Sequence, residues 1–173
     1  FLVASKEAGG LELSTAEVGI VYGTIGVIFL TVGGILGGLF ASRIGLKKSI
    51  WWMAGCMTLP CLTFVYLAIG QPDNLFAIST AIAIEQFGYG FGFVGLTLFM
   101  MQQVAPGRHQ MAHYAFASGI MNLSVMLTGM ASGFLSDLMS YRIFFLAVML
   151  ATIPAFVITR LVPFTYDDKP NDK

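Results

Sequence analysis

Five long apolar segments, separated by short polar ones, most strongly constrain how this chain can fold. They cover residues 18–42, 50–69, 75–105, 114–135 and 143–162. A helix that crosses a bilayer needs about 20 mostly apolar residues, because each residue advances about 1.5 Å along a path of about 30 Å. Only 10% of the residues are charged, against about 25% in soluble domains. The sequence therefore predicts five membrane-spanning helices.

We expect an all-α polytopic membrane protein with three parts. These are the end of a truncated helix with an external loop, the five helices, and a polar cytoplasmic tail, over residues 1–17, 18–164 and 165–173. Phe1–Ala4 is apolar, and we expect it to end a helix that begins upstream. Ser14 and Glu17 have the spacing of a capping box, which predicts a helix that begins near Thr15.

Basic residues divide unevenly between the two sides that alternating loops define. One side holds Arg43, Lys47, Lys48, Arg108, Arg160, Lys169 and Lys173, whereas the other holds Lys6 and Arg142. Cytoplasmic loops are enriched in lysine and arginine. We therefore expect the first side, with the C-terminus, to be cytoplasmic in a multi-pass protein of the cell (inner) membrane. Charges sorted by membrane face indicate the lipid bilayer as a partner and no nucleic acid.

Glu85 is the one ionisable residue well inside a predicted span. A charge at a helix centre costs on the order of 3 kcal/mol even on insertion scales, so its presence needs a reason. Two interpretations are open: the carboxyl group binds a proton or a cationic or hydroxyl-rich substrate, or in its protonated form it ties two helices together. On a helical wheel it shares a face, expected to line a cavity, with Tyr89, Gly92, Leu96, Phe99 and Gln103.

Further polar residues lie in the fourth segment, where Ser118 and Asn122 share a face with Gly129 and Gly133. Hydrogen bonding between helices and a role in transport both explain such a face. The candidates for a substrate or proton pathway are therefore Glu85, Tyr89, Gln103, Ser118 and Asn122.

Other motifs favour packing over cofactor or metal chemistry. Glycines four apart let helices approach closely, and they recur as Gly19/Gly23, Gly33/Gly37, Gly34/Gly38, Gly88/Gly92 and Gly129/Gly133. The glycine spacing in residues 90–95 matches a dinucleotide-binding turn but lacks the preceding strand that such a turn needs. His109 and His113 lack a third zinc ligand, and Cys56 and Cys61 are interpreted as free thiols. We expect no metal and no cofactor.

The loop after the first apolar segment resembles a known family motif. Residues 38–48 read Gly-Leu-Phe-Ala-Ser-Arg-Ile-Gly-Leu-Lys-Lys. The major facilitator superfamily has here a glycine, three residues, aspartate, arginine, any residue, glycine and then basic residues. The matching positions are Gly38, Arg43, Gly45, Lys47 and Lys48, whereas Ser42 replaces the aspartate and Leu46 an arginine. In the family this cytoplasmic loop latches one conformation.

A degraded second copy of the motif runs from Gly133 to Asp137. Its place at the outer end of the fourth helix fits two inverted three-helix repeats. The resemblance implies the C-terminal six-helix half of a transporter, with its first helix mostly missing. It also implies three partners: the N-terminal six-helix half of the same protein, a small-molecule substrate and protons.

A narrower resemblance points to the muropeptide-permease (AmpG-type) and acetyl-coenzyme-A-transporter branch. It rests on residues 13–19, Glu85, Gly90, Gly92, Met101 and Tyr114-Ala115. Members of that branch import cell-wall sugar-peptides with protons or carry a nucleotide thioester. The resemblance implies a secondary active transporter for proton-coupled solute uptake, and not an enzyme.

Two alternatives belong to other functional classes. An integral-membrane lipid-modifying enzyme would need paired acids or histidines on its loops. Asp73 and Asp137 are isolated, and Asp167–Asp168 lies in the polar tail. A non-transporting membrane sensor or assembly subunit would keep the gating residues, which are the matching positions of the loop motif at residues 38–48, but would show no coupled flux.

Overall fold

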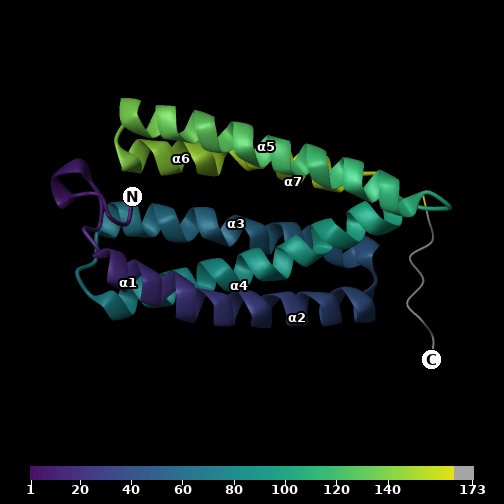
Figure 1. The fold of residues 1–173 in the computed structure, drawn as a ribbon, viewed down its shortest axis with the longest axis horizontal. Coiled ribbons are helices and arrows are strands. Elements are labelled where there is room, and N and C mark those ends of the chain that lie inside the picture. Colours follow the sequence, from purple (N-terminus) through teal and green to yellow (C-terminus); the bar gives the residue numbers. More distant parts are fainter. Residues whose placement is uncertain (166–173) are drawn as a thin grey trace.

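The computed structural model describes residues 1–165, and within that range it contains helices and no strand (Figure 1). Helices long and apolar enough to cross a membrane occupy Thr15–Ile44, Leu46–Gly70, Leu75–Val104, Gln110–Ser136 and Tyr141–Leu161. The prediction of an all-α polytopic fold is confirmed. Most of the expected polar tail, including Asp167 and Asp168, lies outside the described residues. Residues 1–4 form no helix, and their assignment to the end of an earlier one stays a prediction.

Three of the long helices change their winding along their length. The first contains α1 (Thr15–Ile20), the π-helix η2 (Val21–Gly26) and α2 (Val27–Ile44). The third contains α4 (Leu75–Phe99) and the π-helix η3 (Met100–Val104). The fifth divides into α6 (Tyr141–Ala151) and α7 (Ile153–Leu161), where Pro154 lacks the N–H that a continuous helix requires. The other two are α3 (Leu46–Gly70) and α5 (Gln110–Leu138), and a short 3₁₀ turn, η1, covers Lys6–Ala8.

The start of α1 is fixed by the predicted capping box. The Glu17 N–H donates to the Ser14 hydroxyl at 3.2 Å, and the Ser14 N–H donates to the Glu17 carboxylate at 2.8 Å. Two backbone donors that the first turn leaves unpaired are thereby satisfied. The helix accordingly begins at Thr15, three residues before the apolar segment does.

Close contact between α2 and α4 depends on glycine. A Cβ atom built on Gly33 would lie 2.3 Å from the carbonyl oxygen of Phe87, and one on Gly37 would lie 2.6 Å from that of Phe91. From the opposite side, a Cβ on Gly90 would lie 2.2 Å from the Leu30 oxygen. The two backbones therefore touch without a side chain between them, as small residues allow inside membranes.

The face of α4 toward α3 is also built on glycine. A Cβ on Gly92 would lie 2.5 Å from the Met53 carbonyl oxygen, and one on Gly95 would lie 2.9 Å from the Met53 sulfur. The glycines of residues 90–95 thus serve packing, as expected. By contrast, an added Cβ would meet nothing within 4 Å at Gly19, Gly23, Gly129 or Gly133 among the described residues.

The helices form successive layers, with α2 on one side, α4 and α3 in the middle, and α5, α6 and α7 on the other (Figure 1). Within residues 1–165, α3 contacts α6 and α7, whereas α5 contacts only its chain neighbours η3 and α6. Large apolar side chains of α5 such as Met111, Phe116 and Met130 are exposed. In a membrane, such a helix is left to face lipid or other helices.

Candidate functional site

The two ends of the bundle differ, and we name them by their contents. The capped end holds residues 1–14, the α3–α4 connection at 71–74 and the α5–α6 turn. The basic end holds the turn at Gly45, the α4–α5 connection at 105–109 and residues 162–165. Helix ends carrying Arg43, Lys47, Lys48 and Arg160 lie at the basic end.

Glu85 lies in α4, inside the helix bundle and toward the capped end. Its side chain is only 8% exposed, and its Oε2 atom is buried without a hydrogen-bond partner among the described residues. Nearly every buried polar atom in a protein is paired, because an unpaired one costs the free energy of its lost hydration. An unsatisfied carboxyl oxygen therefore marks Glu85 as a functional candidate.

Tyr22 is the side chain that interacts with the Glu85 carboxyl group through its hydroxyl. It belongs to the π-helix η2, which packs on α4 beside Glu85. A Cβ on Gly26 of the same segment would lie 3.3 Å from the Gln86 side chain, so η2 approaches α4 closely there. Short π-helical segments within longer helices are frequent at functional sites. Sequence reasoning missed Tyr22.

An apolar cluster closes the Glu85 site toward the capped end. Ala81 and Ile82, one turn before Glu85, are buried in it together with Val21, beside Tyr22. The cluster also contains Leu11 and Leu13 of the N-terminal loop, together with Leu67 and Ile78. This arrangement is named here the apolar cap, and its α4 residues lie on the capped-end side of Glu85.

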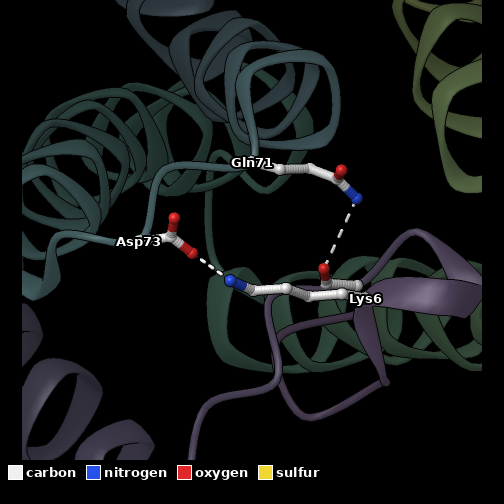
Figure 2. A network of polar contacts seen from close by, with 4 residues as sticks. Lys6, Gln71 and Asp73 are labelled. Atoms are coloured by element: carbon white, nitrogen blue, oxygen red, sulfur yellow. Dashed lines mark hydrogen bonds and ion pairs between the residues drawn. The ribbon is translucent and has the colours of Figure 1, made fainter.

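Polar contacts attach the N-terminal loop to the bundle (Figure 2). The Lys6 ammonium group forms an ion pair with the Asp73 carboxylate in the α3–α4 connection. Close by, the Gln71 amide donates to the Gly10 carbonyl oxygen at 3.5 Å. The bond to Asp73 raises the pKa of Lys6, since it stabilises the charged ammonium. Exposed ion pairs position a loop more than they stabilise a fold.

The predicted stripe on α4 does not form one surface. Tyr89 is 42% exposed although Glu85, one turn away, is buried. Gly92, Leu96 and Phe99 instead line a cavity of about 360 Å³ between α3, α4 and α7, which neither Glu85 nor Tyr89 reaches. Gln103 accepts a hydrogen bond from the Thr165 N–H at 3.0 Å. Different helices pack on α4 at different points along its length, so residues on one face of α4 differ in burial.

The candidates in α5 hydrogen-bond within their own helix. The Ser118 hydroxyl donates to the Ala115 carbonyl oxygen at 3.0 Å, and the Asn122 amide donates to the Ser118 carbonyl oxygen at 2.9 Å. Neither side chain bonds to another helix in the part of the chain that the structure describes. The structure does not bring these residues to Glu85, so their place in a substrate pathway stays a prediction.

The loop motif at the basic end has a backbone conformation that requires glycine. Gly45 has φ 86° and ψ 147°, in a region that other residues avoid, and its N–H donates to the Ala41 carbonyl oxygen at 2.9 Å. It turns the chain directly from α2 into α3. Arg43 and Lys48 are exposed on either side of it. The second motif copy, with Gly133 and Asp137, lies in α5.

Comparison with known proteins covers almost the whole chain. A family model described as Major Facilitator Superfamily matches residues 2–173. The curated "Putative transporter AmpG 3" of Rickettsia typhi is 27% identical over 154 residues, or 87% of this chain and 36% of that protein. The protein of the same name from Rickettsia prowazekii is 27% identical over 137 residues, or 79% and 32%.

A third relative, "Putative transporter AmpG 1" of Rickettsia felis, is 27% identical over 143 residues, or 83% of this chain and 31% of that protein. The chain thus spans about a third of the length of these curated relatives. No solved structure matches it.

Proposed function

Because this chain belongs to the Major Facilitator Superfamily, we propose that the full-length protein is a secondary active transporter in which Glu85 binds the coupled proton. The observation that carries the proposal is the buried Glu85 carboxyl group with its unpaired Oε2 atom. Intramembrane ionisable residues are expensive and commonly mark ion or proton pathways.

The surroundings of Glu85 supply a coupling mechanism. Loss of the proton leaves a charge with an unpaired oxygen atom in the protein interior, which is costly until a new partner arrives. Water admitted by a conformational change supplies that partner. A hydroxyl or amide group of the substrate instead hydrogen-bonds to the protonated, neutral carboxyl group, so that proton and substrate cross the membrane together. With the apolar cap in place, proton exchange runs toward the basic end of the bundle. Opening of the cap exposes Glu85 to the opposite side and completes alternating access.

The names of the relatives support a proposal for the substrate class. The curated proteins that this chain resembles are named putative AmpG transporters. The muropeptide-permease branch that the sequence motifs resemble imports cell-wall sugar-peptides with protons. We extend this activity to the present protein as proton-coupled uptake of muropeptides or related sugar-peptides. Such substrates are rich in hydroxyl and amide groups, which are suitable hydrogen-bond partners for the protonated Glu85 carboxyl group.

The proposal also covers the orientation in the membrane and the roles of the loop around Gly45 and of the N-terminal half. With the basic end cytoplasmic, the positive-inside rule is obeyed in the inner membrane and the gating loop around Gly45 lies inside the cell. Arg43, Lys47 and Lys48 then latch this half against the N-terminal six-helix half in one conformation. Substrate binds between the two halves near the membrane midplane.

The test is uptake of a radiolabelled anhydro-muropeptide into vesicles that contain the full-length protein. We expect uptake to require an inward proton gradient and to be lost in Glu85→Gln, which keeps the shape of the side chain but cannot exchange the proton. Glu7→Gln, an exposed carboxyl change in the N-terminal loop, is the matched control and retains uptake. Normal uptake by a folded Glu85→Gln variant would refute the role of Glu85. Binding without any uptake would favour the sensor alternative.

A further inference from the structure

Two cavities adjoin at the basic end, between the beginning of α3 and the end of α7. One is the cavity of about 360 Å³ described above, and the other has a volume of about 400 Å³. Both are lined by Ile50, Thr159 and Val162, so they meet along a common wall. The two cavities thus lie next to each other. The transport proposal uses Lys47 in the latch but assigns no role to the cavities themselves.

The two cavities differ in chemistry. The deeper one is lined by apolar side chains such as Met53, Leu96 and Phe156 and reaches the glycine face of α4. The outer one has both Lys47 and Arg160 in its lining, contributed by α3 and α7 respectively. Charge is thus confined to the outer part, and the inner part accepts hydrocarbon. A ligand that fits both parts has an anionic head and an apolar tail.

The position along the helices indicates the depth in the membrane. Helix α3 begins at Leu46 and α7 ends at Leu161, so the outer cavity lies where the helices leave the apolar region. Trp51 lines that cavity and contacts Phe156 of α7, with ring centroids 6.2 Å apart, and the neighbouring Trp52 is 63% exposed. Tryptophan gathers at the level of the lipid headgroups. The basic side chains therefore lie at headgroup depth and the apolar cavity at acyl-chain depth.

We propose that this site binds an anionic phospholipid. The phosphate lies between Lys47 and Arg160, and one acyl chain enters the apolar cavity between α3, α4 and α7. Basic pockets between membrane helices attract anionic headgroups, because each nearby lysine or arginine adds electrostatic attraction. The inner volume of about 360 Å³ falls in the range of about 300–1,000 Å³ typical of small-molecule sites. A bound lipid at this place joins α7 to the α3–α4 pair.

Native mass spectrometry of the full-length protein in detergent, titrated with phosphatidylglycerol or phosphatidylcholine, tests the proposal. We expect phosphatidylglycerol to bind more tightly. The Lys47→Gln, Arg160→Gln double variant loses about 30-fold in phosphatidylglycerol affinity, the factor expected for two basic residues at an anionic headgroup. Lys48→Gln, an exposed change next to Lys47 but outside the cavity lining, keeps the wild-type affinity.

Two further measurements distinguish the contribution of the lipid headgroup to binding from that of the acyl chain. Ala155 lines the apolar cavity, so Ala155→Phe fills it and weakens binding of both lipids. Millimolar inorganic phosphate, which has no tail, does not displace bound phosphatidylglycerol. Circular dichroism and gel filtration establish that each variant is folded. Equal affinity for the two lipids, or an equal loss in Lys48→Gln and the double variant, would overturn the proposal, as would displacement by inorganic phosphate alone.

Discussion

Replacing Gly33 with alanine tests the packing of α2 on α4. The new Cβ would lie 2.3 Å from the Phe87 carbonyl oxygen, about 1 Å inside the 3.4 Å at which ordinary contact begins. Since the obstacle is backbone, the helices must separate. Such overpacking costs about 1–3 kcal/mol, and the better helix propensity of alanine returns up to about 1 kcal/mol. We expect Gly33→Ala to lower the free energy of unfolding by about 1–2 kcal/mol.

The adjacent Gly34 provides the control. A Cβ there would meet the Val94 side chain at 3.9 Å, an ordinary contact. Gly34→Ala should therefore be neutral or stabilising by up to about 1 kcal/mol. Unfolding in mixed micelles, followed by circular dichroism on the full-length protein, measures both variants. If Gly34→Ala destabilises as much as Gly33→Ala, the assignment of the α2–α4 contact to Gly33 is wrong.

Three more predictions concern the site and its supports. Tyr22→Phe removes the hydroxyl that faces Glu85 and should slow proton-driven uptake roughly 2- to 12-fold. Tyr66→Phe, a change at an exposed tyrosine, should leave the uptake rate unchanged. Equal uptake rates in the two variants would exclude a role for Tyr22 in uptake. Gly45→Ala places a side chain at φ 86° and should cost about 1–3 kcal/mol of stability, measured as above, with unchanged stability contradicting the strain. A spin label at Ser5→Cys should gain mobility in Lys6→Gln at pH 7. With Lys6 in place, the label should gain mobility only as the pH rises above 10.5, because the pKa of Lys6 is raised. A gain in mobility at neutral pH would contradict the ion pair.

Local physical rules made much of the fold predictable. The apolar segments predict the helices because a bilayer leaves a spanning backbone no other way to pair its polar groups. The hydrogen bonds of the Ser14–Glu17 box lie within one turn, so four residues of sequence suffice to predict them. No strand precedes the glycines of residues 90–95, which predicts a packing role, and their contacts with α2 and α3 confirm it.

The surroundings of Glu85 were less predictable. A helical wheel places Tyr89 on the same face of α4 as Glu85. It carries no information about which neighbouring helix covers each point along α4. Tyr22 is far from Glu85 in the sequence, and only the packing of η2 on α4 brings the two side chains together. The tyrosine hydroxyl inside an apolar segment was the available signal. Its partner, however, depends on tertiary packing.

The proton role of Glu85 is tested most directly by the internal pH of proteoliposomes that contain the full-length protein and a trapped fluorescent pH indicator. With no gradient imposed beforehand, external anhydro-muropeptide should acidify the interior in the wild type, since each substrate molecule brings in a proton. Glu85→Gln should bind the substrate and give no acidification. Acidification by Glu85→Gln at the wild-type rate would contradict the assignment of Glu85 as the proton site.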